Sequence, residues 1–437
     1  MRQKHTTQGS IFWFRPEHEI CGFFNRIDQW LQDHPVISDW VSKDLSANCK
    51  SGRPGMNCDQ VLRSAIAMRY QQCSYRGLEF LLKDSLSFQH FCRIDPFKVP
   101  GKSTLAANIG TIRPATWRKL NQCFIKDMKS GGFETGERLR IDSTVAESHI
   151  LFPTDSKLLY NAIRMMVRLL RRLRPIVHIG YVNHSRRAKR HWFAATMAKT
   201  AEQRYPHYKA LLVDVEETRL KLIETQKALK IKGNWVSDAD GIEHLLQMVS
   251  KVMSQTTQRV MLGESVPVED KVVSLHEPHT DIIKKGGRDV QFGHKLNLST
   301  GASGLVLDVV IERGNPADNR RFLGMLKRHL RIYGEVPNAV AVDGGYAAQE
   351  NLVKAKEMGV RSVAFDKRVN LTIEDMTGTD GLYRELKRFR AGIEASISYL
   401  KRCFGMSRVK WKGWENFQSS IYLSVFSHNL IVWARSG

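Results

Sequence analysis

Hydrophobic residues recur at intervals of three and four along the first third of the chain, the spacing of one face of an α-helix. The pattern covers 18–34 and again 59–92, with a Gly- and Pro-containing break between the two. Further on, Ser103 suits the N-cap of a short helix, and Pro114 suits the first turn of another. The pattern therefore predicts an all-α N-terminal domain over 1–135.

The period changes from helical to alternating at 137–148, which reads ERLRIDSTVAES. Leu139, Ile141 and Val145 fall on one side and Asp142 on the other, which predicts a strand. Acidic residues are uncommon in strands. Asp142 is therefore a candidate functional residue.

Alternating patterns return in the last third of the chain. The stretches 289–300 and 304–314 are joined by the turn-forming GASG and predict two hairpin strands. A helical stretch follows, then the apolar strand 337–347, which reaches Asp343, then another helix and the short strand 360–367. Two hairpin strands followed by alternating helix and strand predict a mixed α/β sheet.

A long helical segment separates the first strand from the others and predicts an insertion over 155–265. Residues 156–201 contain eleven Lys or Arg and no acid. A solvated pair of charged helices would explain such a run, but the lack of any compensating acid favours a surface that contacts phosphates. The candidate contacts in this run are Arg186, Arg187 and Arg190.

The whole chain carries a formal charge of +23 at pH 7, with a pI near 9.8. This charge favours a polyanionic partner, and double-stranded DNA is the first candidate. The N-terminal helices would then bind DNA or dimerise, and a helix-turn-helix and a plain bundle both fit their pattern.

Membrane and metal-thiol classes are disfavoured. No apolar run reaches the roughly 18 to 20 residues of a spanning helix, and the N-terminus lacks an apolar signal core. We therefore expect a cytoplasmic, nucleoid-associated protein with no membrane partner. The seven cysteines form no C-x-x-C pair, which favours reduced thiols over a zinc site.

One acid stands out in the basic stretch 386–412, where Glu394 is accompanied by eight Lys or Arg. On a helix, Arg390, Glu394 and Lys401 fall within about 40° of one another, and Lys387 extends the same stripe to about 60°. A carboxylate facing a metal ion, with cations gripping the phosphates of a bound strand, would need this arrangement.

A divalent ion needs further hard oxygen ligands. The acids best placed for this are Asp142 in RIDST and Asp343 in AVDGG, where the glycines would allow a DNA backbone to approach. Asp318 could compete, but its position at a helix start is explained by capping and the helix dipole. Lys295 lies on a strand that should border the site, and a phosphate contact and an ordinary surface lysine fit it equally.

RIDST, AVDGGY and R-x-x-x-E-x-x-x-x-x-x-K, in this order and with a helical insertion, resemble the motifs of the DDE transposases of bacterial insertion sequences. The resemblance implies a ribonuclease H-like mixed sheet with flanking helices, a catalytic domain formed here by 136–154 and 266–437. Its first and fourth strands would bring Asp142 and Asp343 together. Glu394 matches the acid of the helix that packs across the sheet, with Arg390 and Lys401 matching the signature around it. Lys387 stands where the family often has tyrosine.

The resemblance also implies the activity. Two Mg²⁺ ions, with Mn²⁺ able to substitute, would be held by the three acids during DNA cleavage at transposon ends and strand transfer to target DNA. Because two ends must be held together, a homodimer on DNA is expected. Two alternatives stay open, a non-catalytic DNA-binding descendant and a structure-selective nuclease on the same fold. The terminal repeats, the target sequence and the route of excision are not encoded in recognisable form.

Overall fold

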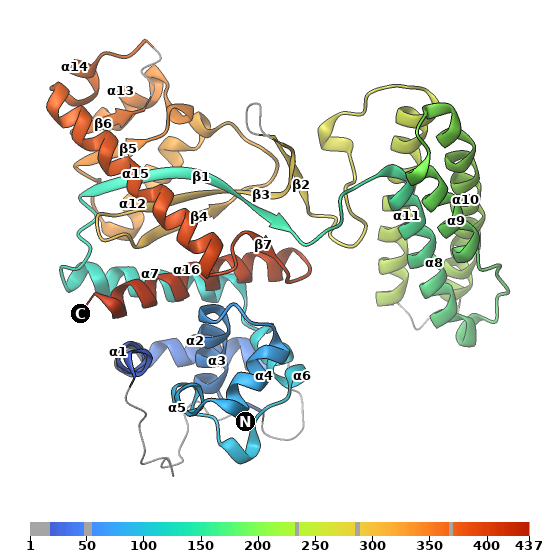
Figure 1. Ribbon diagram of the computed structural model, residues 1–437, viewed down its shortest axis with the longest axis horizontal. Helices are drawn as coiled ribbons and strands as arrows, with labels where there is room; N and C mark the ends of the chain where they lie inside the picture. The colour runs from blue at the N-terminus through green and yellow to red at the C-terminus, as the bar shows by residue number, and fades with distance from the viewer. Residues whose placement is uncertain (1–17, 48–54, 232–235, 285–288, 367–369, 437) are drawn as a thin grey trace. The chain divides into compact units, whose positions relative to one another are not determined.

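A computed structural model describes residues 18–47, 55–231, 236–284, 289–366 and 370–436. Contacts divide the chain into two units, Met1–Ser148 with Gly293–Gly437 (unit 1) and His149–Phe292 (unit 2). Figure 1 traces both along the chain. Among the described helices, none is long and apolar enough to cross a membrane, and the six described cysteines are all free thiols.

The N-terminal part of unit 1 is helical, as the three-and-four spacing predicts. The run 59–92 forms three helices rather than one, because Gln72 takes a left-handed backbone (φ 47°) and the Ser74 side chain caps the next helix. The prediction for Ser103 is wrong: the helix starts at Lys102, with Gly101 at its N-cap. These helices are α1 (Glu19–Asp33), α2 (Val36–Ala47), α3 (Cys58–Tyr70), α4 (Tyr75–Asp84), α5 (Leu86–Cys92), α6 (Lys102–Ile109) and α7 (Pro114–Ser130).

The predicted mixed α/β sheet is confirmed. It has seven strands, five of which lie side by side in the order β2-β3-β1-β5-β6. In addition, β4 pairs with β3 and β7 pairs with β1. The β1–β3 and β3–β4 pairs are antiparallel, whereas β1, β5 and β6 run parallel to one another. The strands are β1 (Arg138–Ser148), β2 (Asp281–Ile283), β3 (Gln291–Thr300), β4 (Val306–Ile311), β5 (Ala339–Val342), β6 (Ser362–Phe365) and β7 (Arg408–Val409).

The parallel strands need crossover connections, and helices supply them. After β4 the chain forms α12 (Phe322–Tyr333), and between β5 and β6 it forms α13 (Gln349–Glu357). The strands β5 and β6 are four-residue apolar segments, almost wholly buried, as expected of strands covered on both faces. The C-terminal helices are α14 (Ile373–Thr377), α15 (Asp380–Cys403) and α16 (Trp414–Arg435).

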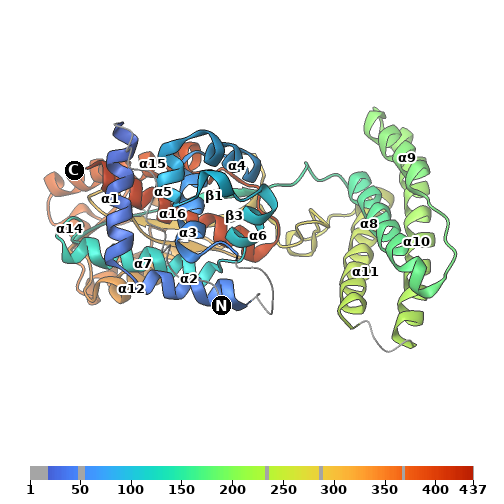
Figure 2. The same cartoon turned by 90° about the horizontal axis from the view of Figure 1, so that it is seen from below.

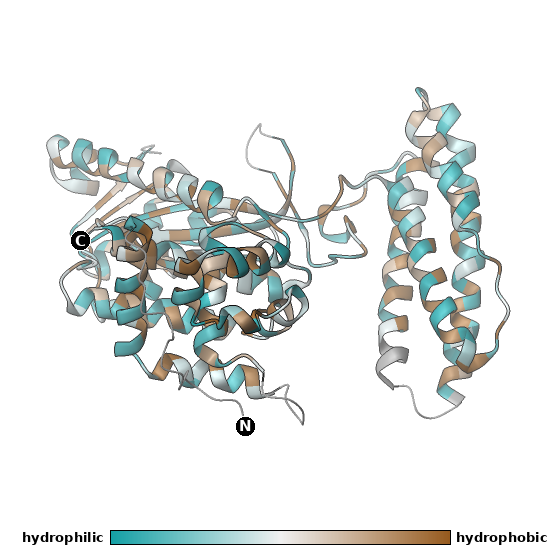
Figure 3. Cartoon of the chain, turned by 60° about the horizontal axis from the view of Figure 1, so that its bottom comes forward, coloured by the Kyte–Doolittle hydropathy of each residue, from teal (hydrophilic) through white to brown (hydrophobic). Residues whose placement is uncertain are grey.

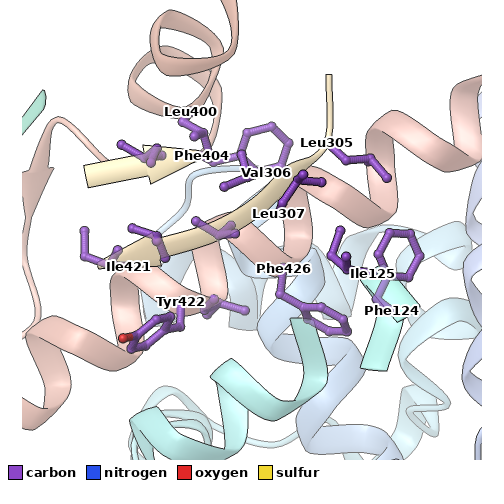
Figure 4. Close-up of a cluster of buried hydrophobic side chains, with 14 of the residues drawn as sticks. Phe124, Ile125, Leu305, Val306, Leu307, Leu400, Phe404, Ile421, Tyr422 and Phe426 are labelled. Atoms are coloured by element: carbon purple, nitrogen blue, oxygen red, sulfur yellow. The ribbon is translucent and has the colours of Figure 1, made fainter. Parts of the chain in front are cut away.

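The hydrophobic core of unit 1 joins the N-terminal helices to the C-terminal ones. Figure 4 shows β4 surrounded by side chains such as Phe124 of α7, Phe426 of α16 and Phe404. One buried amide in this core is fully paired: the Asn429 amide donates to Val306 O (2.8 Å) and to Asn121 Oδ1 (2.8 Å). The apolar stretch near the C-terminus thus lies in the buried helix α16.

A buried arginine makes a second connection between the two ends of the chain. Arg69 of α3 donates to Ser420 Oγ (2.9 Å) and to Phe404 O (3.3 Å). Burial lowers the pKa of its guanidinium to about 10. These contacts explain why the N-terminal helices belong to the same unit as the sheet.

Unit 2 is a bundle of four helices, α8 (Asp155–Val177), α9 (Ser185–Met197), α10 (Ala201–Ile231) and α11 (Val236–Thr256). It has a core of its own, in which Leu159, Ile163, Leu211, Leu222 and Val249 are fully buried. Figure 2 shows the helices side by side, and Figure 3 shows hydrophilic and hydrophobic residues alternating along them. This alternation is typical of amphipathic helices that bury one face.

Candidate active site

Asp142 and Asp343 lie on neighbouring parallel strands. In the β1–β5 ladder, Ile141 is the partner of Val342, and each acid is the next residue along its strand. Both acids are half-buried. The pairing therefore brings two carboxylates, separated by 200 residues of sequence, to adjacent positions at the end of β5.

The backbone fixes one oxygen of each carboxylate. Asp142 Oδ1 accepts a hydrogen bond from the amide of Ser143 (2.6 Å), and Asp343 Oδ1 accepts one from the amide of Gly344 (2.7 Å). Gly344 begins the short helix η5 (Gly344–Tyr346). Each carboxylate is thus oriented by the residue that follows it.

Tyr346, at the end of η5, lies close to several carboxylates. Burial raises the pKa of its phenol well above the usual value, and the charges of Asp318 and Asp142 raise it further. The charge of Asp343 acts in the same direction. Three carboxylates therefore lie within electrostatic range of one buried side chain.

Glu394 lies on α15, which packs against β1, as the crossing in Figure 1 shows. Arg140 Nη1 donates to Phe389 O (3.0 Å), its guanidinium lies 4.4 Å from the centre of the Phe389 ring, and it leaves no room for a Cβ atom at Gly392. Because alternate residues of a strand share a face, Asp142 points to the same side as Arg140. Asp142 therefore faces the layer that contains Glu394.

The C-terminal end of α15 shows in which direction the helix runs along β1. Burial lowers the pKa of Lys401, and the charge of Glu147 at the end of β1 raises it. Since Phe389 lies at Arg140 and Lys401 lies near Glu147, α15 and β1 run the same way. Glu394 falls between these two contacts, along the part of β1 that carries Asp142.

The Glu394 carboxylate is 61% exposed and pairs with Arg390 Nη2 at 3.0 Å. Of the residues that the structure describes, just one set of three His, Cys, Asp or Glu ligand atoms lies within 4.8 Å of one another, and it does not include Asp142, Asp343 or Glu394. The structure thus brings Asp142 and Asp343 to adjacent positions and Glu394 to the helix over them, without closing the three into one cluster.

The set that meets this spacing lies in unit 2 and consists of His184, Asp214 and Glu217. This set was not predicted from the sequence, although Asp214 and Glu217 are three apart on α10 and so share a helix face. The Arg187 guanidinium binds Asp214 and lies 3.3 Å from Glu217, and Glu217 also lies 3.1 Å from His184 Nε2. An internal cation already compensates these acids, so we interpret the set as a structural ion-pair cluster.

The predicted position of Asp318 at a helix start is confirmed, and the structure adds an ion pair to it. Asp318 begins the short helix η4 (Asp318–Arg320), and its Oδ1 lies 2.6 Å from Lys295 Nζ. Lys295 is 3% exposed and also donates to Pro316 O (2.8 Å). Because the ammonium is buried and compensated, the structure does not support a phosphate contact by Lys295.

The other predicted DNA contacts differ in how accessible they are. Lys387 is exposed and pairs with Asp366 (3.0 Å), Arg390 pairs with Glu394, and Lys401 is half-buried. The side chain of Arg187 is 46% exposed and pairs with Asp214 and Glu217, so its role in DNA binding stays a prediction. The side chains of Arg186 and Arg190 are exposed.

The donor set formed by Asp142 within β1 and Asp343 just after β5 suits a hard divalent cation. Asp142 and Asp343 offer carboxylate oxygens from adjacent positions, and both charges add to the burial that raises the pKa of Tyr346. Carboxylate oxygens are the ligands that Mg²⁺ and Mn²⁺ prefer. Glu394, on the layer that Asp142 faces, would complete such a set.

Comparison with known protein families gives two matches. Residues 266–430 match the family described as Transposase DDE domain, and residues 13–110 match the family described as Transposase domain (DUF772). The first match includes Asp343 and Glu394, whereas Asp142 lies outside it. Searches of curated proteins and of solved structures gave no match.

Proposed function

The chain belongs to the DDE transposases of insertion sequences, and on that premise we propose that it cleaves DNA at transposon ends and joins the freed 3′ ends to target DNA. The observation that carries this proposal is the parallel pairing of β1 with β5, which sets Asp142 and Asp343 at adjacent positions. Glu394 extends from the helix that packs over β1.

Asp142, Asp343 and Glu394 would hold the divalent ions. When bound there, two Mg²⁺ ions, or Mn²⁺ in their place, would activate water or a 3′ hydroxyl and stabilise the leaving oxygen of an in-line displacement. The backbone amides of Ser143 and Gly344 keep the two strand carboxylates oriented. Arg390 holds Glu394 and places a guanidinium where a DNA phosphate would approach.

DNA would contact unit 1 through Lys387, Arg390 and Lys401 of α15 and unit 2 through Arg186 and Arg190 of α9. In this proposal, residues 136–154 and 266–437 form the ribonuclease H-like catalytic domain, 155–265 are its basic insertion, and 1–135 bind DNA or dimerise. The protein would act in the cytoplasm on the nucleoid, as a homodimer that holds two transposon ends. Light scattering of the complex with terminal-repeat DNA would test the dimer.

Three variants, each of which replaces one acid by its uncharged amide, test the catalytic assignment. Asp142→Asn, Asp343→Asn and Glu394→Gln should each abolish Mg²⁺-dependent cleavage of terminal-repeat DNA, because each removes a ligand charge, while DNA binding survives. Glu385→Gln is the matched control, since Glu385 lies on the same helix as Glu394 and is paired with Arg138 (2.9 Å). If any of the three variants cuts as fast as the Glu385→Gln control, the proposed set is wrong.

A strand-transfer assay separates transposition from simple nuclease activity. The proposed function requires that pre-cleaved ends with free 3′ hydroxyls become joined to a target plasmid in the presence of Mg²⁺. The same three variants should lose joining together with cleavage, because one site would serve both steps. Cleavage without any joining would contradict the transposase assignment of the activity.

A further inference from the structure

The turn that follows Asp343 rests on a second short helix. The Asn351 amide donates to Tyr346 O in η5 (3.0 Å) and to Asn319 O in η4 (2.8 Å), so one side chain connects the two segments. A Cβ atom at Gly345 would lie 3.3 Å from Asp318 Oδ2, which is closer than ordinary van der Waals contact. The Asp318 carboxylate therefore packs directly against the backbone two residues after Asp343.

Lys295 holds Asp318 from the other side. Its ammonium lies 2.6 Å from Asp318 Oδ1 and is 3% exposed, and its further partner is Pro316 O, two residues before Asp318. Lys295 belongs to β3 and faces Val145 of β1 in the ladder. The ion pair therefore attaches η4 to the strand next to the one that carries Asp142.

Tyr346 completes the connection between the sheet and η5. The side chain is fully buried, and its hydroxyl donates to Asn297 Oδ1 (2.8 Å) on β3. The Asn297 amide in turn donates to Glu312 Oε1 (2.9 Å), and Glu312 pairs with Arg321 (2.6 Å). This chain of contacts attaches the last residue of η5 to β3, the strand that also carries Lys295.

From this geometry we infer that Asp318, held by Lys295, is a positioning residue of the candidate site that fixes the Gly344–Tyr346 turn and through it the Asp343 carboxylate. The inference rests on the proposed function. Asp318 would then do more than compensate a buried lysine. Its Oδ2 atom faces Gly345, and its charge acts on the Tyr346 phenol together with the charges of Asp142 and Asp343.

A double variant separates these two roles. Asp318→Asn alone would leave a buried ammonium without its counter-ion, which destabilises proteins strongly. Lys295→Met combined with Asp318→Asn removes both charges, and such neutral replacements are often tolerated. If Asp318 merely compensates Lys295, the double variant should cut DNA at the wild-type rate. If Asp318 positions Asp343, cleavage should stay about 10- to 100-fold slower, the usual effect of removing an outer-shell partner.

A matched control removes a comparable ion pair elsewhere in the sheet. Asp308 of β4 and Arg328 of α12 form a partly buried pair with an oxygen–nitrogen distance of 2.8 Å. The double variant Asp308→Asn with Arg328→Met should leave cleavage unchanged. An equal loss of cleavage in the two double variants would contradict a specific role for the Lys295–Asp318 pair.

A glycine variant tests the contact without touching either charge. In Gly345→Ala the added methyl group meets the Asp318 carboxylate, whereas in Gly324→Ala of α12 it meets nothing within 4 Å. The first variant should lose cleavage, and the second should not. This pair decides the question if the charge variants fail to fold.

Metal binding without DNA gives a readout that a purely structural role would not change. In calorimetric titration with Mn²⁺, the Lys295→Met, Asp318→Asn double variant should bind about 10- to 100-fold more weakly than the wild type, at an unchanged melting temperature. Wild-type Mn²⁺ affinity in this folded variant would overturn the inference. If Asp142→Asn also bound Mn²⁺ and cut DNA normally, the proposed function itself would be wrong. If the double variant behaved as the wild type but Asp142→Asn did not, only the positioning role of Asp318 would be wrong.

Discussion

At the scale of single residues, two buried histidines of unit 1 are held neutral. Burial lowers the pKa of His329 and of His428 to about 4, from a usual value near 6.5. His428 lies in the middle of α16, and the ring of His329 stacks on Tyr333 at 4.5 Å. Because each imidazole binds a proton less readily in the folded protein than in the unfolded chain, the stability of unit 1 depends on pH.

The pH dependence follows from the direction of these shifts. Because the folded pKa lies below the unfolded pKa, the stabilisation is fully present above about pH 6.5 and is lost as the pH falls toward 4. Each histidine would then cost on the order of 3 kcal/mol of unfolding free energy at pH 4. Urea unfolding at pH values between 4 and 8 should show this loss. In His329→Phe the unfolding free energy should depend less steeply on pH. A flat profile for the wild type would contradict the prediction.

At the scale of elements, α9 has one buried and one cationic face. Ala188 and Ala195 are buried, whereas Arg186, Lys189 and Arg190 are exposed. Arg187 is exposed too, but it pairs with Asp214. The helix contains no acid. Phe193 and Met197, which are 57% and 60% exposed, continue the outer face beyond the cations. Charge complementarity makes this face suited to a phosphate backbone.

The triple variant Arg186→Ala, Lys189→Ala, Arg190→Ala should weaken DNA binding and reduce the salt dependence of the affinity. Each lost phosphate contact lowers the slope of log K against log salt by about 0.9, so the slope should fall by up to about 3. Fluorescence anisotropy at several salt concentrations would measure it. The control Lys209→Ala, Lys227→Ala, Lys251→Ala changes the charge equally on exposed positions of α10 and α11. Equal slopes for the two variants would show that the α9 face has no special role.

At the scale of the whole molecule, the insertion enters and leaves at one point of the sheet. Glu147 at the end of β1 is the ladder partner of Gly293 in β3, so the chain segments on either side of unit 2 lie next to each other. Unit 2 has its own core. The N-terminal helices differ, because α3 and α7 pack on α16 inside the common core of unit 1.

Replacing residues 149–292 by Asn-Gly should therefore give a folded unit 1, since β1 and β3 would then be joined by a short hairpin loop. A single cooperative thermal transition with the circular dichroism of a mixed α/β protein is the expected result. Removing residues 1–113 instead should yield aggregated protein, because α16 would keep α7 but lose its contacts with α1 and α3. A soluble, cooperatively folded truncation would contradict this view of the core.

Much of the architecture followed from the sequence. The strand carrying Asp142, a strand leading to Asp343 and a helix carrying Glu394 were predicted from the sequence, and the structure has them, although β5 ends at Val342, one residue before Asp343. The division of 59–92 into three helices was missed, because the break depends on one left-handed residue and one cap. The strands β2 and β7, of three and two residues, are too short for a periodic signal.

The sequence by itself determined the elements and the family, because periodicity and short motifs are local properties of the chain. Tertiary structure alone decided which charged groups are available. Lys295 and Arg187 read as phosphate contacts in the sequence, but folding places each beside an acid far away in the chain, Asp318 and Asp214. A charge is compensated by its neighbours in space, and these depend on strand pairing and helix packing, which no local pattern encodes.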